Sequence, residues 1–199
     1  MSHLHTTNVA SLLSNPLEMH KTTSLYTTAL VLAFAFLCAC DNHSEFSKKY
    51  PVNFSYMVSA SQQLFTTMGN YGQFCTIRRE TSNGKTEIVM TNTLGTGRYT
   101  INETQKYFNY GLGGLIVGTN IYGQHLAYDL ACPNCDRNTR RLSLDDAGYA
   151  TCKHCGLTYD MNNLGVITSK DSTARPQTDA RGMLRYRITY NGTTITVYN

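Results

Sequence analysis

The segment Cys132-Pro-Asn-Cys135 is followed, after sixteen intervening residues, by Cys152-Lys-His-Cys155-Gly156. Two Cys-x-x-Cys pairs at this separation match the spacing of four-thiolate zinc sites. The two-residue gap lets the chain bend so that both sulfurs of a pair reach one ion, at metal–sulfur distances of about 2.3 Å. Gly156 suits the tight turn after the second pair, because glycine adopts positive φ without steric cost. The pattern predicts a metal held by these four cysteines; two disulfides or a dithiol redox pair are the alternatives.

The composition fits one globular domain with an appended segment: 199 residues, of which 41% are hydrophobic and 15% are charged. The formal net charge of +4 is mild and spread along the chain. The densest basic spots are Arg78-Arg79 and Arg137-Asn-Thr-Arg140-Arg141. A nucleic-acid-binding surface usually has a longer basic stripe, so we expect no nucleic-acid partner.

The first 39 residues have the pattern of a targeting segment. Lys21 precedes the apolar run Ala29–Leu37, which is too short to span a bilayer as a mature helix. A positive region, a short apolar region and small residues at the exit are typical of a secretory signal. Translation from Met19 would give the best signal, so residues 1–18 are expected to be an extension.

The end of the apolar run, Leu37-Cys38-Ala39-Cys40-Asp41, resembles the lipobox of bacterial lipoproteins. The resemblance implies that Cys40 is acylated and becomes the mature N-terminus, which anchors the chain to the inner or outer membrane. Cys38 is an unusual residue at its place in the box. The alternative is an ordinary cleaved signal and a soluble periplasmic product.

This division sets the expected fate of each cysteine. Of seven cysteines, six remain after cleavage before Cys40: one for lipid, four for metal, and Cys75. Cys75 lies in the apolar run Gln73–Ile77, which favours a buried, inert thiol. Residues 40–50 are polar and are expected to form a tether, and residues 51–199 to form the folded domain.

The domain is predicted to be mainly β. Pro51–Val58 alternates apolar and polar residues, as in a half-buried strand, and a short helical turn or loop follows over Ser61–Met68. Ser82-Asn83-Gly84 predicts a hairpin between strands at Phe74–Arg79 and Thr86–Asn92, because Asn-Gly accepts the positive φ of a primed turn. After residue 50, no segment shows sustained helical periodicity.

The segment Gly111–Gly118 is rich in glycine but lacks the Gly-Lys-Ser/Thr ending of a phosphate loop. We interpret it as the entry into a buried strand at Leu115–Val117. A second strand at His125–Leu130 then leads directly to Cys132. His125 is interpreted as an ordinary strand residue.

From Gly114 to the end, the chain resembles the Rieske iron–sulfur domain. The strands Leu115–Val117 and Leu126–Leu130 enter the first loop as in that family, and Cys152–Asp160 follows its Cys-x-x-His-Gly-Ser-x-Phe/Tyr-Asp pattern. Further matches are the turn and strand at Leu164–Ile167, a proline loop at Arg175-Pro176, and a closing hairpin over Leu184–Ile188 and Thr193–Val197 that turns at Asn191-Gly192. The resemblance implies an antiparallel Rieske-like β-sandwich with two metal-binding loops, the metal-binding part spanning about residues 128–165.

The match departs from the family at the ligands. The first loop has Cys132-x-x-Cys135 in place of Cys-x-His, Cys155 replaces the second histidine, and Leu157 replaces the serine beside the cluster. Tyr159 keeps the place of an aromatic that reaches a ligand sulfur. Rieske clusters owe their raised potential to two neutral imidazoles. Four thiolates instead favour zinc, with a 2Fe-2S cluster or a single iron as alternatives.

The expected function is therefore that of a membrane-anchored, metal-binding lipoprotein whose closed site is structural or binds a protein partner at the metal tip. The alternative is an electron-transfer protein that carries a 2Fe-2S cluster or a single iron. A fully coordinated ion has no open position for water, and no catalytic constellation emerges; Asp145-Asp146 is explained by turn chemistry. We therefore expect no enzyme activity. His154 is expected on the surface, and with Lys153, Arg137, Arg140 and Arg141 it would make the metal tip basic.

Overall fold

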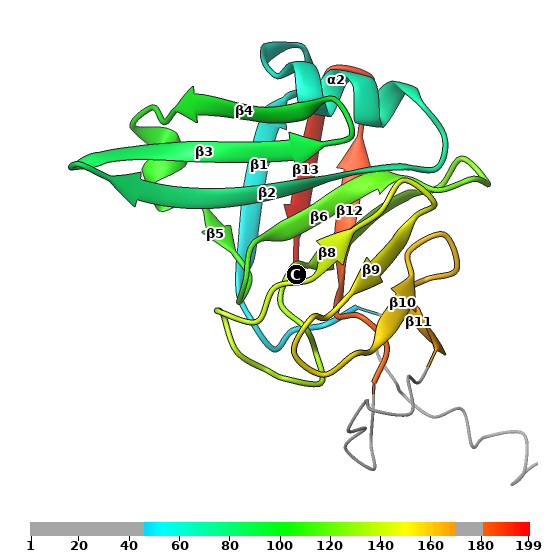
Figure 1. Cartoon of the computed structure of the whole chain (residues 1–199). Coiled ribbons are helices and arrows are strands. Elements are labelled where there is room, and N and C mark those ends of the chain that lie inside the picture. The colour runs from blue at the N-terminus through cyan, green and yellow to red at the C-terminus, as the bar shows by residue number, and fades with distance from the viewer. Residues whose placement is uncertain (1–45, 170–180) are drawn as a thin grey trace, which may run out of the picture. The chain divides into compact units, whose positions relative to one another are not determined.

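Antiparallel strands form almost all of the regular structure in the computed structural model, which describes residues 46–169 and 181–199. These residues belong to the unit Ser44–Asn199 (Figure 1). The expectation of a mainly β fold is confirmed. The predicted signal, the lipidation site Cys40 and the proline loop at Arg175-Pro176 lie outside the described residues.

The elements follow one another along the chain with short connections. They are β1 (Val52–Met57), the 3-10 turn η1 (Val58–Ala60), α2 (Gln62–Gly69), β2 (Gln73–Ser82), β3 (Lys85–Asn92), β4 (Gly95–Thr100), the 3-10 turn η2 (Thr104–Tyr107), β5 (Asn109–Tyr110), β6 (Leu115–Thr119), β7 (His125–Asp129), β8 (Ser143–Leu144), β9 (Tyr149–Thr151), β10 (Thr158–Asp160), β11 (Val166–Ser169), β12 (Arg185–Tyr190) and β13 (Thr194–Tyr198).

Nine strands form one curled sheet in the order β4-β3-β2-β6-β7-β12-β13-β1-β5. All of its pairings are antiparallel. The closing hairpin β12–β13 is inserted between β7 and β1, so it joins the middle of the sheet to the first strand. The other four strands form a small sheet in the order β11-β10-β9-β8.

Two hydrophobic cores use opposite faces of the large sheet. Leu115 and Val117 of β6 belong to the core inside the curl, together with Cys75. Ile116, between them, points into a second core against the small sheet, which also contains Tyr159. Because successive side chains of a strand point to opposite faces, β6 is buried on both sides. This explains why its sequence is continuously apolar.

The predicted hairpin between β2 and β3 is present. Ser82 pairs with Lys85, and the two residues between them, Asn83 and Gly84, have φ values of 51° and 73°. Positive φ at both central residues is the geometry of a type I′ turn. The Asn-Gly signal therefore set the register of this strand pair.

The short helix α2 covers one end of the curled sheet (Figure 1). Ser61 begins it, because the Ser61 side chain accepts a hydrogen bond from the backbone N–H of Leu64 at 3.3 Å. Leu64 and Met68 point into the inner core.

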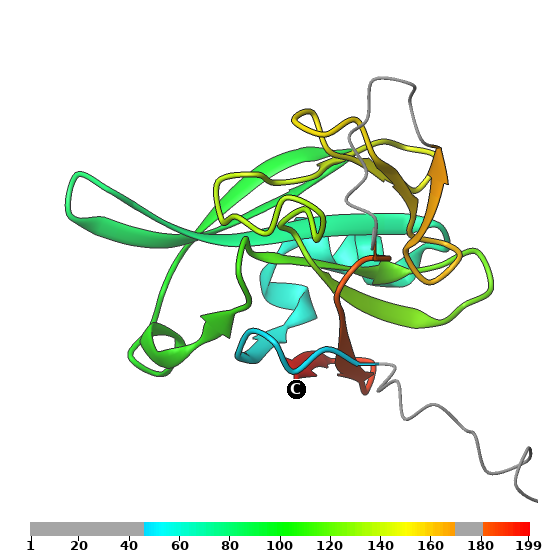
Figure 2. The ribbon, with the colours of Figure 1, turned by 90° about the horizontal axis from the view of Figure 1, so that it is seen from below.

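The small sheet lies over one face of the large sheet, as Figure 2 shows for its yellow and orange strands. Its residues Ala150, Leu157 and Tyr159 are fully buried, and they pack with Tyr128 of β7 in the second core. The two predicted metal loops are the connections at the start and in the middle of this small sheet. One follows β7, and the other joins β9 to β10.

Candidate metal centre

The four predicted cysteine ligands come together in space. Their sulfur atoms all lie within 4.8 Å of one another. Cys132 Sγ is 3.6 Å from Cys155 Sγ, and Cys135 Sγ is 3.7 Å from Cys152 Sγ. Each close contact joins the two loops, so both Cys-x-x-Cys pairs contribute to one cluster.

The first loop is held in shape by backbone hydrogen bonds. Strand β7 leads into it, and the N–H of Cys132 donates to the carbonyl of Arg140 at 2.8 Å. The N–H of Asp136 then donates back to the carbonyl of Cys132 at 2.9 Å. Asp136 has a φ of 51°, an αL conformation that Asp tolerates better than most residues. The turn therefore closes directly after Cys135.

The second loop repeats this geometry. The N–H of Gly156 donates to the carbonyl of Cys152 at 2.9 Å, and the N–H of Cys152 donates to the carbonyl of Leu157, also at 2.9 Å. Gly156 has a φ of 74°, as the sequence analysis expected for this position. Asp136 and Gly156 thus occupy equivalent positions one residue after each second cysteine. The role of Asp136 was missed, because Gly or Asn is the usual residue there.

The sulfur distances fit a single tetrahedral ion. Four sulfurs at about 2.3 Å from a central metal are separated along each tetrahedron edge by about 3.8 Å. The two closest pairs, at 3.6 and 3.7 Å, approach this value. Both distances are far longer than a disulfide bond of about 2.05 Å, and the four residues are free cysteines.

Burial controls the electrostatics of the metal-free site. Cys132 and Cys152 are fully buried, and Cys135 and Cys155 are half-buried. Burial raises the pKa of Cys132 to about 11 and raises the pKa of Cys135 above its usual range. Burial also acts to raise the pKa of Cys155, but hydrogen bonds from the Leu157 N–H and from neighbouring side chains outweigh it and lower that pKa. A metal that binds here therefore displaces protons from thiols.

Tyr159 of β10 contacts the site from within the second core. Its hydroxyl lies 3.6 Å from Cys132 Sγ, as the sequence analysis expected for this aromatic. Burial, followed by the contact with Cys132, raises the pKa of Tyr159, so the phenol keeps its proton. Leu157 is fully buried beside it. This wall of the site therefore offers one polar hydrogen and otherwise apolar contact.

Asp129, at the end of β7, fastens the strand that leads into the first loop. Its side chain is 1% exposed. Oδ1 accepts from the N–H groups of Ala131 at 2.7 Å and Gly113 at 3.0 Å. Oδ2 accepts from the Leu112 N–H and from the Tyr186 hydroxyl, both at 2.7 Å. These contacts bring the glycine-rich segment, β12 and the root of the metal loop together. The sequence analysis did not identify this residue.

The chain segment before β1 is attached to the first metal loop. Asp136 accepts a 2.6 Å hydrogen bond from the Tyr50 hydroxyl and forms a 2.6 Å ion pair with Lys49. The side-chain amide of Asn199 donates to the carbonyls of Ser47 and Tyr50. Part of the predicted tether, residues 46–50, is thus an ordered strap. We use this name for residues 46–50 below.

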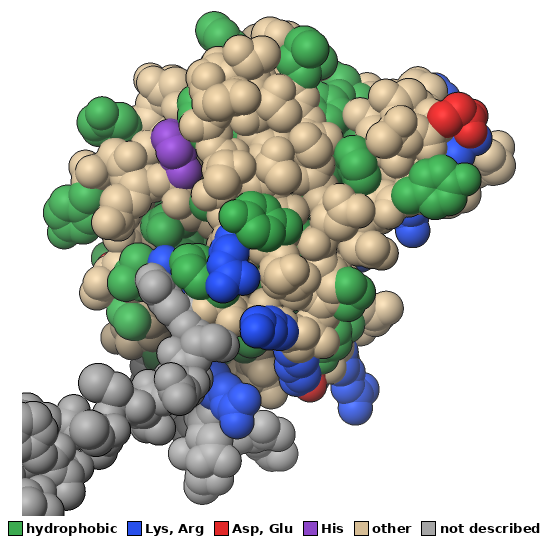
Figure 3. All heavy atoms as spheres, turned by 180° about the vertical axis from the view of Figure 1, so that it is seen from behind, with side chains coloured by type: hydrophobic (Ala, Val, Ile, Leu, Met, Phe, Trp, Pro, Cys, Tyr) green, Lys and Arg blue, Asp and Glu red, His purple; other side chains and the backbone are tan. Residues whose placement is uncertain are grey.

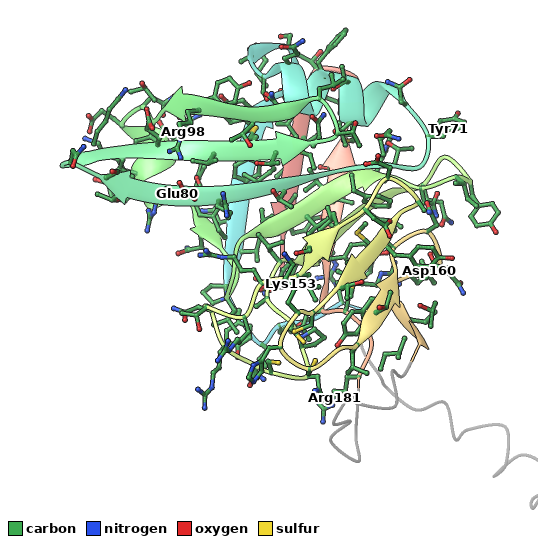
Figure 4. The ribbon with its side chains drawn as sticks, in the orientation of Figure 1. Tyr71, Glu80, Arg98, Lys153, Asp160 and Arg181 are labelled. Carbon is green, nitrogen blue, oxygen red and sulfur yellow. The ribbon has the colours of Figure 1, made fainter. Side chains whose placement is uncertain are left out.

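The basic side chains predicted near the metal lie on the surface. Arg137, Arg140, Arg141, Lys153 and His154 are exposed. Most of the Lys and Arg side chains visible on the rear face gather in its lower part (Figure 3). Lys153 lies in the second loop close to the sulfur atoms (Figure 4). Cations here offset the double negative charge of an ion bound by four thiolates.

The remaining candidates lie away from the cluster. Cys75 is fully buried in β2, and burial raises its pKa to about 12, as expected of an inert thiol. His125 Nδ1 lies 3.0 Å from the Thr119 hydroxyl on the neighbouring strand, consistent with a strand residue. Asp145 accepts hydrogen bonds from the N–H groups of Ala147 and Tyr149, which is the predicted turn role.

Comparisons with models of known protein families, with curated proteins and with solved structures find no match to this chain. Among the described residues, no helix has the length and apolar character needed to cross a membrane. The four-cysteine cluster therefore provides the main evidence on function.

Proposed function

We propose that this chain is an exported, membrane-anchored lipoprotein that binds one metal ion, zinc in the first place, in a closed four-cysteine site. The observation that carries the proposal is the convergence of four sulfurs to within 4.8 Å of one another. Its role is structural or partner-binding rather than enzymatic. Four protein ligands complete a tetrahedral shell, so no position is left for the water that hydrolytic zinc enzymes activate.

The sulfur geometry favours one ion over a two-iron cluster. In a 2Fe-2S cluster, two cysteines bind each iron, and the bridging sulfides hold the two pairs apart. Here the close sulfur contacts cross between the loops, and no sulfur is more than 4.8 Å from another. The resemblance to Rieske domains is therefore proposed only for the two-loop arrangement on a β scaffold, with a different ligand set.

The strap supports a position of the metal end close to the proposed anchor. Six residues separate Cys40 from Phe46, a span of at most about 20 Å when fully extended. Strap residues Lys49 and Tyr50 contact Asp136, which directly follows the ligand Cys135. A lipid on Cys40 would thus hold the metal end near the membrane surface, where exposed cations such as Lys153 would face anionic headgroups or a membrane partner.

A second candidate function is electron transfer by a single iron in the same site. The hydrogen bond from Tyr159 to Cys132 favours it, because hydrogen bonds to ligand sulfurs tune iron–sulfur potentials. Cys135 and Cys155 are half-buried, so an electron could leave through the exposed side of the site.

Elemental analysis combined with a visible spectrum of the anaerobically purified chain tests the proposal. One zinc per chain without visible absorption is the expected result. One iron without inorganic sulfide, together with visible absorption bands, would support the electron-transfer role. A metal-free protein with all four thiols oxidised would overturn both functions.

A further inference from the structure

A polar hollow of about 220 Å³ lies beside the glycine-rich segment Gly111–Gly114. Its other lining includes Arg78 and Arg79 from β2 and Arg141 from the end of the first metal loop. No carboxylate is among the residues that line it. Figure 1 shows β5 and the start of β6 beside β2, where this hollow lies. Three guanidinium groups thus face one small space.

The fold holds each of these arginines in place by a different contact. Arg78 Nη2 forms a 2.9 Å ion pair with Glu80. Arg79 Nη1 donates to the carbonyl of Lys106 at 3.0 Å, and Arg141 Nε donates to the carbonyl of Gly113 at 2.8 Å. A guanidinium carries five N–H donors, and each of these contacts uses one nitrogen. The arginines are therefore positioned, with donors to spare.

One of the spare donors is buried. Arg78 Nε is inaccessible to solvent and has no hydrogen-bond partner among the described residues. Leaving a buried charged donor unpaired costs free energy, so native proteins rarely do so without a reason. An acceptor that enters the hollow would remove this cost.

The neighbouring acidic groups are already committed. Glu80 is shared between Arg78 and Arg98. Asp129 lies beneath the glycine-rich segment, but its oxygens accept from three backbone N–H groups and from the Tyr186 hydroxyl. The charge of Asp129 weakens anion binding without supplying a ligand. Within the described residues, the three arginines thus retain a positive excess at the hollow.

We infer that the hollow binds a phosphate-class oxyanion, either inorganic phosphate or the phosphate group of a monoester. Guanidinium groups form paired N–H···O contacts with phosphate oxygens. Three of them around one space suit an anion with several equivalent oxygens. A monoester would place its phosphate in the hollow and its organic part outside. This site uses none of the four cysteines, so the inference does not depend on the bound metal.

Isothermal titration of the intact chain, with its metal bound, tests the inference at constant ionic strength. Inorganic phosphate is one probe and glycerol 3-phosphate is the other. We expect saturable binding of one phosphate per chain. Arg79→Gln and Arg141→Gln should each weaken it by about tenfold or more, because each removes charge-assisted hydrogen bonds. Arg137→Gln, which alters an exposed arginine outside the hollow, should leave the affinity unchanged.

Circular dichroism of each variant without phosphate establishes that it is folded. If a glutamine variant is unfolded, Arg79→Lys and Arg141→Lys replace it, since lysine keeps the charge but loses the paired donors. The lysine variants should also bind phosphate more weakly. Binding of inorganic phosphate alone would assign the free ion, and equal binding of both probes would assign a monoester. Equal phosphate binding by the hollow variants and by Arg137→Gln, or no saturable binding to the unaltered chain, would overturn the inference.

Discussion

Replacing Asp129 with Asn should destabilise the domain far more than an isosteric change usually does. The asparagine oxygen can still accept from Gly113 and Ala131. Its amide nitrogen, however, would face the N–H of Leu112, where the carboxylate accepted a 2.7 Å hydrogen bond. The Tyr186 hydroxyl can rotate and become an acceptor, but a backbone N–H cannot. One buried donor is therefore left unpaired.

The structure sets the size of this effect. A buried unsatisfied donor costs about 1–3 kcal/mol, and the remaining bonds lose the strength that an ionised acceptor gave them. We expect a total loss of about 3 kcal/mol, against a usual domain stability of about 5–15 kcal/mol. Tyr186→Phe removes only the hydroxyl donor to Asp129 and should cost about 1.5 kcal/mol.

Urea unfolding of the metal-loaded chain, followed by circular dichroism, measures these losses. Asp145→Asn is the matched control, because Asp145 is exposed and asparagine can keep its turn contacts. The control should change the unfolding free energy by less than about 0.5 kcal/mol. Equal losses for the Asp129 and Asp145 variants would refute the view that Asp129 fastens the root of the metal loop.

Three further perturbations test other parts of the structure. Cys132→Ser should lose the metal and destabilise the domain, whereas Cys75→Ser should keep one metal per chain; equal metal content by elemental analysis would disprove the ligand assignment. Alkali should destabilise the metal-loaded chain, because burial raises the pKa of both Cys75 and Tyr110 to about 12. Both groups stay protonated when folded but ionise once unfolded, the Cys75 thiol from about pH 9, so stability is complete below that pH and falls as pH rises towards 12. Urea unfolding should show a loss of about 1 kcal/mol between pH 9 and pH 10 from Cys75 alone, and a flat profile would contradict this. Asp136→Asn should loosen the strap by removing the ion pair with Lys49, at a cost within about 1 kcal/mol because the pair is exposed; hydrogen exchange at residues 47–50 should become faster, and unchanged exchange would count against the strap contact.

The elements that the sequence analysis placed correctly are those with local signals. The alternation at Pro51–Val58 gave β1, and Asn83-Gly84 and Asn191-Gly192 each joined two predicted strands into a hairpin. The four ligands followed from their spacing, because a metal imposes both ligand type and separation. No such local signal marked β4, whose two glycines weaken its β propensity.

The features that escaped the sequence analysis depend on distant residues. Asp129 reads as an ordinary polar residue after an apolar strand until Tyr186, 57 positions later, donates to it. The strap was expected to be a flexible tether, and its contact with Asp136 joins residues 86 positions apart. The hollow has the same origin, since Arg141 reaches it from a loop far from β2 in the sequence. Pairings of this kind follow from the sheet order rather than from any local pattern.

X-ray absorption at the metal edge of the purified chain tests the central claim most directly. One ion bound by Cys132, Cys135, Cys152 and Cys155 predicts a first shell of four sulfurs at about 2.3 Å and no second metal nearby. The same result is expected for zinc and for a single iron, so the geometry is tested apart from the identity of the ion. A shell that contains nitrogen or oxygen ligands, or a metal–metal distance typical of a two-iron cluster, would contradict the account.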